Sequence, residues 1–254
     1  MKKLIRFIVR TIPRPILIRF SKIFSFLAKP FYSGNKVECP ICESHFGKFM
    51  PYGNQGNENR LCPNCLSLER HRLMWLYLKN HSDFFTKDYR VLHFAPEKPF
   101  LKRFRKLPLK SYTTADLVSP IAELHIDVTA MPLPDNSYDV LFCNHVLEHV
   151  DSDIKAMQEI YRVLAPGGWA IMQVPLNNEL AETYEDLTIT DPKERERIFG
   201  QYDHVRIHGR DYPERLRKAG FEVEEFDANN FLSSELMERY RLSNGEVLYL
   251  ARKS

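Results

Sequence analysis

The first 37 residues of this 254-residue chain contain no aspartate or glutamate, although they hold nine lysine and arginine side chains. The remainder carries 27 basic against 33 acidic side chains, so the formal charge of +3 combines a segment of +9 with a body of −6. The chain also lacks an uncharged apolar run of membrane-spanning length, because cations, Pro13 and Pro15 interrupt its apolar N-terminal segment. The sequence therefore predicts neither a transmembrane helix nor a secretory signal peptide, which needs one unbroken apolar core.

Glycine is scarce as well, with ten residues in the chain and none between Gly56 and Gly167. This gap excludes a glycine loop that cradles phosphates in that interval. Apolar residues make up 44% and charged residues 27%, close to globular averages, which excludes wholesale disorder, collagen and disulfide scaffolds. The length suits two average domains or one large one and is ample for a closed core.

The basic segment predicts two short amphipathic helices hinged at Pro13 to Pro15. At the period of a helix, the basic residues of segments 2–12 and 16–29 lie apart from an apolar face rich in Phe, Leu and Ile. This composition is typical of a helix that lies in an anionic membrane interface, so residues 1–30 are a candidate membrane surface. Packing against its own domain or a dimer partner remains the alternative. We treat residues 1–36 as a basic helical arm.

Two Cys-x-x-Cys pairs are separated by nineteen residues, a spacing that predicts a four-cysteine zinc site. Four thiolates would fill the coordination sphere, so the metal is expected to be structural. A pair of redox dithiols is the weaker alternative, and Cys143 is expected to be a core residue. The module and its connecting helix, expected at 67–81, are assigned to residues 37–82. The predicted metal ligands are Cys39, Cys42, Cys62 and Cys65.

From residue 89 the chain alternates strand-like and helical runs, which predicts an α/β domain over residues 83–254 with a mostly parallel, doubly wound sheet. Ligands of such sheets bind beyond the carboxyl ends of the strands. Two acidic residues, Asp116 and Asp127, end successive strands and suit a nucleoside that lacks phosphates. Strands are expected at 90–94, 112–115, 123–126, 138–143, 169–174, 221–226 and 246–251, and helices at 154–164 and 213–219.

Residues 126–175, IDVTAMPLPDNSYDVLFCNHVLEHVDSDIKAMQEIYRVLAPGGWAIMQVP, closely resemble class I S-adenosylmethionine-dependent methyltransferases, of the methyltransferase type 11 kind. The resemblance extends over about residues 89–252, and the chain is also similar to a subgroup with an N-terminal cysteine module. It implies a Rossmann-like sheet, mostly parallel with an antiparallel last strand, and S-adenosylmethionine as cofactor. The chain departs from the family at the first strand, where a glycine-free run replaces the usual acidic, glycine-rich loop.

Carried over by position, the resemblance places Asp116 on the ribose hydroxyls with Leu117 beside it. Asp127 and Val128 are then expected at the adenine, and Asn144 and His145 beside the methionine part and its sulfonium. In the glycine-free run, Glu97 would meet the ammonium of the cofactor and Ala95 would permit close backbone approach. The complete run assigned to the cofactor is His93, Phe94, Ala95, Pro96 and Glu97.

Methyl transfer needs an acceptor lone pair aligned with the sulfonium, so positioning and exclusion of water carry most of the catalysis. If a base is used, His145 or His204 is the candidate; each is equally open to a structural role. Asp203 and Arg206 are open to a surface ion pair. The residues assigned to acceptor binding are His149, Tyr202, Asp203, His204, Arg206 and His208.

The sequence favours a cytoplasmic methyltransferase with a small-molecule, lipid or glycan acceptor, held by its arm at the inner face of a membrane. An RNA methyltransferase is the second hypothesis, weakened because the body outside the arm is net acidic. A non-catalytic binding protein that keeps the fold is the third. The acceptor and the oligomeric state stay open.

Overall fold

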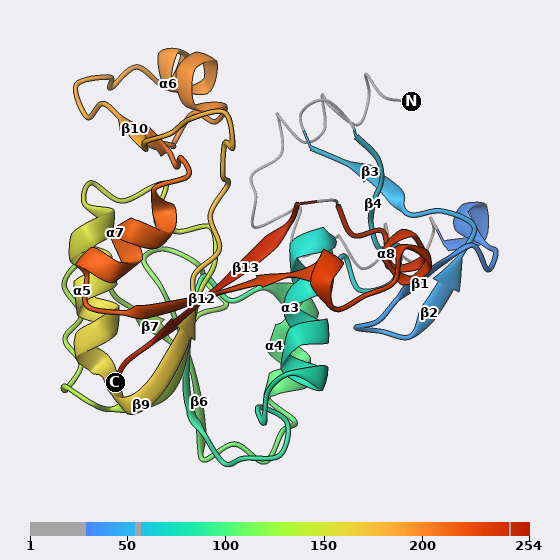
Figure 1. Ribbon diagram of the computed structural model, residues 1–254, viewed down its shortest axis with the longest axis horizontal. Coiled ribbons are helices and arrows are strands. Elements are labelled where there is room, and N and C mark those ends of the chain that lie inside the picture. The colour runs from blue at the N-terminus through green and yellow to red at the C-terminus, as the bar shows by residue number, and fades with distance from the viewer. Residues whose placement is uncertain (1–28, 54–56, 244) are drawn as a thin grey trace. The chain divides into compact units, whose positions relative to one another are not determined.

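The computed structural model describes residues 29–53, 57–243 and 245–254 (Figure 1). The expected helices of the basic arm lie in residues 1–28, outside the described residues. Unit 1 of the fold comprises the described residues up to Asp83 together with Lys98–Lys102 and Asp227–Glu246. Unit 2 comprises Phe84–Glu97, Arg103–Phe226 and Val247–Ser254. Unit 1 draws on two segments that the sequence division assigns to residues 83–254, and that division stays a prediction.

Unit 1 is built from two small antiparallel hairpins followed by a helix. In the first hairpin Val37 pairs with Phe46 and Cys39 with Ser44. The expected helix at 67–81 is α3, which begins slightly later. No helix in the described part of the chain is long and apolar enough to cross a membrane. The elements are η1 (Lys29–Tyr32), β1 (Val37–Cys39), β2 (Ser44–Phe46), β3 (Met50–Tyr52), β4 (Asn57–Leu61), α3 (Glu69–Asn80), η2 (Ala228–Asn230) and α8 (Ser234–Tyr240).

Arg72 of α3 joins the segments of unit 1. Its side chain is fully buried and lies over the Phe49 ring, 4.7 Å from the centroid. Its guanidinium donates to the carbonyl oxygens of Ser67 and Arg60, each at 3.0 Å, and to those of Tyr240 at 2.6 Å and Arg241 at 2.9 Å. A buried cation is tolerated here because carbonyl dipoles replace its hydration. Arg72 therefore ties the end of α8 to the cysteine module.

Unit 2 holds a seven-stranded sheet with the order β12-β13-β9-β8-β5-β6-β7. The pairs β5–β6, β6–β7, β5–β8 and β8–β9 are parallel, and β13 is antiparallel to β9. The class I methyltransferase fold expected from the resemblance is confirmed. The strands are β5 (Arg90–Phe94), β6 (Ser111–Asp116), β7 (Leu124–His125), β8 (Tyr138–Cys143), β9 (Leu164–Ile171), β12 (Glu222–Asp227) and β13 (Val247–Arg252).

The expected strands and helices of unit 2 agree closely with those observed, with one clear difference at β9. The sequence predicts a turn at Pro166 to Gly168 and a strand from 169, whereas β9 begins at Leu164, directly after the helix. The register with β8 jumps from Tyr138 opposite Leu164 to Val140 opposite Trp169, so the Pro-Gly-Gly run forms a bulge inside the strand. Gly167 has φ of +77°, which explains why glycine suits that bulge.

Helices pack on the sheet, and an insertion follows β9. The helices of unit 2 are α5 (Asp153–Val163), α6 (Pro192–Phe199) and α7 (Tyr212–Lys218); α4 (Lys98–Phe104) is divided, with its first five residues in unit 1. Ser152 caps α5, because its side chain accepts from the Lys155 N–H. The insertion, residues 175–211, contains α6 and a short hairpin of β10 (Tyr184–Glu185) and β11 (Arg206–Ile207). Figure 1 shows α6 and β10 beyond α7, away from the sheet.

Candidate active site and metal centre

The switch in strand order lies between β5 and β8. The chain runs from β5 outward through β6 and β7 on one side and through β8 and β9 on the other. A crevice at such a point is where open α/β sheets bind ligands. Just beyond the two strands, the Asn144 side-chain amide donates to Oε2 of Glu97 at 2.9 Å. Oδ1 of Asn144 accepts from the Gln173 N–H at 3.2 Å, so the buried amide is held from both ends. Glu97 is thus fixed at the switch point.

Two residues at this edge have left-handed backbones although neither is glycine. Ala95, after β5, has φ of +46°, and His145, after β8, has φ of +55°. Their amides are held by neighbouring strands, with Ala95 N–H donating to Ala115 O and His145 N–H to Gln173 O, each at 2.8 Å. Such strained conformations persist where the surroundings fix them and are common at functional sites. The glycine-free run therefore makes a sharp turn after β5 without a glycine.

Asp116 is the last residue of β6, and Asp127 follows the end of β7 by two residues. Oδ1 of Asp116 accepts from the Val118 and Ser119 amides, at 2.8 and 2.7 Å. Oδ1 of Asp127 accepts from both the amide and the hydroxyl of Thr129, each at 2.8 Å. Each turn fixes one carboxylate oxygen. Leu117, next to Asp116, is 64% exposed, whereas the side chain of Val128, next to Asp127, packs in the core.

Two residues that the sequence assigns to the cofactor have side chains directed elsewhere. His93 is fully buried, with Nδ1 2.8 Å from the Tyr112 hydroxyl and its ring against Phe142 at 5.5 Å. Phe94 lies in the opposite core, beneath α5. Successive residues of a strand point to opposite faces of the sheet, so His93 and Phe94 are buried on different faces. Neither side chain is directed at the expected cofactor site. Within the run, the buried Pro96 is followed by the partly exposed Glu97 at the edge.

Three histidines of the sequence analysis, His145, His149 and His204, lie around Glu148, which follows β8. The Glu148 side chain is 2% exposed, and its Oε1 lies 3.2 Å from Nδ1 of His145. Burial alone would raise the pKa of this carboxyl, but the His145 hydrogen bond and the charges of His145 and His149 outweigh it and hold the pKa below its usual value. The rings of His149 and His204 meet edge to face at 4.7 Å. Burial lowers the pKa of His204, which favours the neutral imidazole.

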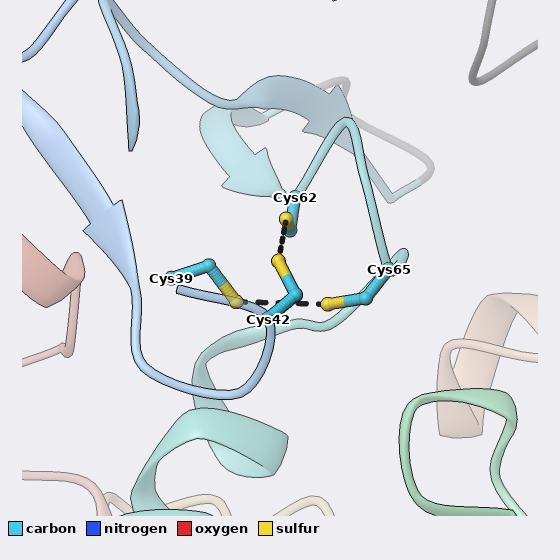
Figure 2. A group of neighbouring side chains, drawn as sticks. All are labelled: Cys39, Cys42, Cys62 and Cys65. Carbon is cyan, nitrogen blue, oxygen red and sulfur yellow. Dashed lines mark hydrogen bonds between the residues drawn. The ribbon is translucent and has the colours of Figure 1, made fainter. Parts of the chain in front are cut away.

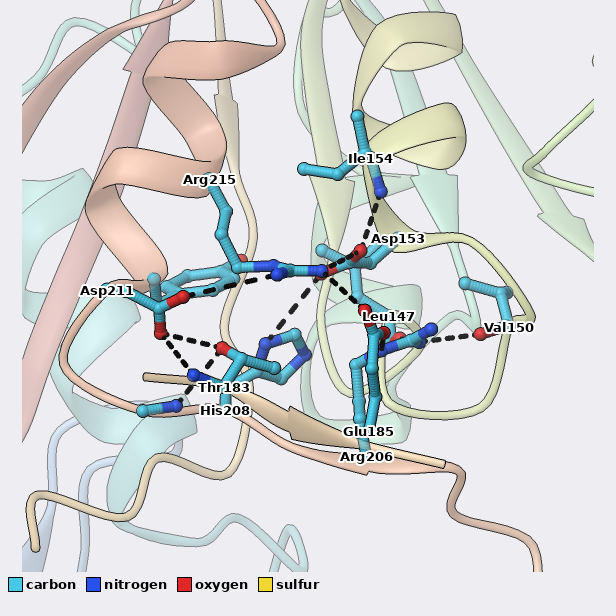
Figure 3. A network of polar contacts seen from close by, with 12 residues as sticks. Leu147, Val150, Asp153, Ile154, Thr183, Glu185, Arg206, His208, Asp211 and Arg215 are labelled. Carbon is cyan, nitrogen blue, oxygen red and sulfur yellow. Dashed lines mark hydrogen bonds and ion pairs between the residues drawn. The ribbon is translucent and has the colours of Figure 1, made fainter. Parts of the chain in front are cut away.

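The remaining residues assigned to the acceptor divide into two groups. Tyr202 is 49% exposed, and Asp203 lies beside His149, with its Oδ2 3.6 Å from Nδ1. Arg206 and His208, in contrast, are fully buried in a polar network (Figure 3). The interpretation of these two as acceptor-contacting residues is corrected, because their side chains reach no surface.

The network of Figure 3 fixes the insertion to the loop between β8 and α5. Arg206 donates from Nη1 to the carbonyls of Leu147 and Val150, and from Nη2 to that of Asp151 at 3.0 Å. Its ion pair is with Glu185, at 3.0 Å, instead of the surface pair with Asp203 considered above. Sequence patterns do not reveal this arrangement, because its acceptors are main-chain carbonyls.

Asp153, at the start of α5, receives two hydrogen bonds from Arg215 of α7, at 2.6 and 2.8 Å. Burial opposes ionisation of this carboxyl, but the Arg215 hydrogen bond and the nearby cations lower its pKa overall. His208 lies 3.9 Å from Asp153, and burial lowers its pKa to about 4. A neutral His208 therefore packs beside an ionised Asp153.

The four cysteines of unit 1 meet as the sequence predicts (Figure 2). The Sγ atoms of Cys39 and Cys65 lie 3.6 Å apart and those of Cys42 and Cys62 lie 3.7 Å apart, and all four Sγ atoms lie within 4.8 Å of one another. These separations are far longer than a disulfide bond. They match the S···S edge of about 3.8 Å that Zn–S bonds of about 2.3 Å give in a tetrahedron.

Both Cys-x-x-Cys turns have the same backbone design. In the first, Glu43 has φ of +54° and its N–H donates to Cys39 O at 2.8 Å. In the second, Leu66 has φ of +62° and its N–H donates to Cys62 O at 3.0 Å. Each turn thereby presents its two thiols to one point. The donor set and its spacing fit one tetrahedral zinc ion.

Comparisons with known proteins agree with this architecture. Residues 81–172 match the family model of a methyltransferase domain. A probable S-adenosylmethionine-dependent methyltransferase of Mycolicibacterium smegmatis is 30% identical over 101 residues, which are 40% of this chain and 35% of that protein. A demethylmenaquinone methyltransferase of Chlamydia trachomatis is 38% identical over 50 residues, which are 20% of this chain and 22% of that protein. The chain thus matches about a fifth to a third of the length of these relatives.

Among solved structures, a [4+2]-cyclase named SpnF has a TM-score of 0.51 and 15% identity, covering 94% of this chain and 95% of that one. At this identity the likeness concerns the fold alone, and one fold supports different reactions. The matching family model and the strand order agree with each other. Residues 81–172 are therefore similar to a methyltransferase domain, and unit 2 has the class I methyltransferase fold.

Proposed function

We propose that unit 2 binds S-adenosylmethionine at the β5–β8 switch point and transfers its methyl group to a small-molecule, lipid or glycan acceptor. The observation that carries this proposal is the Glu97–Asn144 hydrogen bond, which fixes a carboxylate where the strand order reverses. The cofactor supplies an electrophilic methyl group on a sulfonium. Every other element of the reaction is positioning and proton handling by the residues of this edge.

Each end of the cofactor has a matching group at the edge. Glu97 would bind the ammonium of the methionine part, and the carboxylate of Asp116 would accept hydrogen bonds from the ribose hydroxyls. Asp127 and the backbone of Val128 would meet the adenine. Because Oδ1 of Asp116 and of Asp127 is held by a local turn, each Oδ2 has a fixed direction. Preorganised acceptors of this kind cost little reorganisation when the ligand binds.

His145 is the residue we propose as the base for an acceptor that must lose a proton. Its side chain is 28% exposed, and Nδ1 faces the carboxylate of Glu148 at 3.2 Å. A carboxylate is an acceptor, so Nδ1 carries the hydrogen and Nε2 keeps the lone pair that accepts a proton. Glu148 would orient the ring and stabilise its protonated form, as the acid of a Ser-His-Asp triad does.

We further propose that the four cysteines hold one structural zinc ion, and that residues 1–30 attach the protein to an anionic membrane from the cytoplasmic side. The support for zinc is the tetrahedral spacing of the thiols. The support for the membrane is the charge of the segment, which has nine cations and no acid before residue 38. An acceptor that resides in or near a membrane would suit such an arm.

Calorimetric titration of the full chain with S-adenosylhomocysteine tests the cofactor site. Wild type should bind one equivalent, and Glu97→Gln and Asp116→Ala should each weaken binding by roughly ten- to a hundredfold, the value of a hydrogen bond to a charged group. Asp88→Ala, an exposed carboxylate before β5, is the matched control and should bind as wild type does. Absence of binding by the zinc-loaded wild type would reject the proposal in favour of a non-catalytic protein.

A further inference from the structure

Glu148, His149 and His204 form a second group of metal-ligand type, separate from the cysteines. One side-chain donor atom from each lies within 4.8 Å of the others. Two of the residues follow β8 and the third precedes β11, so chain segments more than fifty residues apart bring them together. Two imidazoles and one carboxylate make a common donor set for first-row divalent metals.

Glu148 supplies the observation that points to a ligand. Its side chain is 2% exposed. Oε1 is in contact with His145, but Oε2 is buried and has no hydrogen-bond partner among the described residues. A buried carboxylate oxygen without a partner is costly and rare in folded proteins. A cation bound at Oε2 would remove that cost.

His149 is oriented as a metal-ligating histidine is, and His204 lies against it. Nδ1 of His149 lies 3.1 Å from the carbonyl oxygen of Asp203. A carbonyl oxygen only accepts hydrogen bonds, so Nδ1 carries the hydrogen and the lone pair is on Nε2. Metal-binding histidines usually donate their second nitrogen in this manner, which fixes the ring and its tautomer. The ring of His204 lies edge to face against that of His149, with 4.7 Å between the centroids.

The backbone that carries these side chains is also fixed. Val205, next to His204, donates its N–H to the carbonyl of Glu148 at 3.0 Å. The neighbouring Arg206 binds the carbonyls of Leu147 and Val150, on either side of Glu148 and His149. Ligand positions are therefore set by main-chain contacts before any ion is present, which is the arrangement that a metal site requires.

We propose that Glu148, His149 and His204 bind one divalent transition-metal ion, with Zn²⁺ as the reference ion. Three protein ligands leave at least one coordination position open, whereas the four-cysteine site is closed. Water or an oxygen donor of a bound ligand would fill that position. The proposal does not depend on methyl transfer, because the ion would be held by side chains of this chain alone.

Metal content of the full-length protein tests the proposal. After loading with Zn²⁺ and removal of free metal, wild type should contain two equivalents by mass spectrometry of the metal. His149→Ala and His204→Ala should each contain one. His125→Ala, which removes an exposed histidine of β7, should contain two. Loading with Co²⁺ separates the sites, since the cysteine site gives an intense thiolate band that should persist in both variants while the weaker nitrogen–oxygen bands disappear.

A wild-type protein with one equivalent, and no histidine-dependent uptake of Zn²⁺, Co²⁺ or Ni²⁺ on titration, would overturn the proposal and leave a hydrogen-bonded cluster. Thermal melting shows whether each variant is folded, and His149→Gln, close to histidine in size, replaces any alanine variant that is not. Binding of S-adenosylhomocysteine is measured on the same samples. If wild type binds S-adenosylhomocysteine but takes up no second metal, this proposal fails and the proposed function stands. If wild type takes up the second metal but does not bind S-adenosylhomocysteine, only the proposed function fails.

Discussion

The Asn144 amide donates to the Glu97 carboxylate at 2.9 Å and joins the carboxyl ends of β8 and β5 at the point where the strand order reverses. The same amide group accepts from the Gln173 N–H on β9's C-terminal side. Three neighbouring strand ends are thus connected through one buried asparagine. Its effect is to hold a single carboxylate at the edge where open α/β sheets bind ligands.

Replacing Asn144 by alanine should weaken S-adenosylhomocysteine binding by roughly tenfold, because the Glu97 carboxylate loses the donor that orients it. Isothermal titration calorimetry measures the change. Asn80→Ala, an exposed asparagine at the end of α3, serves as the control. Unchanged affinity in Asn144→Ala would show that Glu97 is positioned without this hydrogen bond.

Cys42→Ser should lose one zinc equivalent and destabilise unit 1, since three thiolates hold zinc far less firmly than four. Structural zinc in small domains contributes on the order of 10 kcal/mol to folding, so the loss should be visible as an early unfolding transition. Metal analysis combined with circular dichroism of the melt measures both effects. Cys143→Ala removes the buried thiol in unit 2 and should keep its full zinc content.

Arg206→Met should lower the free energy of unfolding by about 3 to 5 kcal/mol, because the carbonyls of residues 147, 150 and 151 lose their buried donor. Urea denaturation followed by fluorescence gives the value. The exposed Arg197→Met in α6 should change it by less than about 0.5 kcal/mol. An equally small change for Arg206→Met would mean that the insertion is held by other contacts.

His208 should make the protein less stable as the pH falls from about 6.5 to 4. Burial lowers its pKa to about 4 in the folded protein, while the unfolded chain has the ordinary value of about 6.5. Between these values the unfolded state binds a proton that the folded state does not, so stability decreases as the pH falls.

The His208→Gln variant should lose this contribution, worth about 3 kcal/mol between pH 7.5 and 4 for a fully buried group. Urea midpoints of the variant and wild type at several pH values give the difference. Protonation of Asp153 also costs stability toward acid, because its folded pKa is lowered, but its partner Arg215 is present in both proteins, so most of this contribution cancels. Parallel pH profiles would contradict the assignment.

Local signals in the sequence were sufficient for most of the sheet. Runs such as residues 90–94 and 138–143 are short, apolar and bounded by polar residues, and they coincide with β5 and β8. Ser152 marked the start of α5 because capping depends only on neighbouring residues. The β9 bulge was missed, since the Pro-Gly-Gly run that usually ends a helix is absorbed here by pairing with β8.

The candidate sites also divide into features that the sequence predicts and features that it does not. The two Cys-x-x-Cys pairs were enough to predict the cysteine cluster, because zinc ligands in such turns are adjacent in sequence. The strand-end positions of Glu97, Asp116 and Asn144 also followed from the alternation of strands and helices. The directions in which the side chains point could not be predicted from this alternation. His93 turns into an aromatic cluster, and Arg206 is buried against carbonyls that no residue pattern encodes.

The sequence by itself determined the charge of the N-terminal segment, the spacing of the four thiols and the order of strands and helices, because these depend on composition and short-range periodicity. Only the tertiary structure decided that Glu148 is buried, that one of its oxygens has no partner among the described residues, and that His204 lies against His149. The physical reason is that burial and ligand geometry arise from contacts between segments that are distant in the sequence. Here Val205 and Arg206 hydrogen-bond to main-chain carbonyls of the loop after β8 and so hold β11 against it.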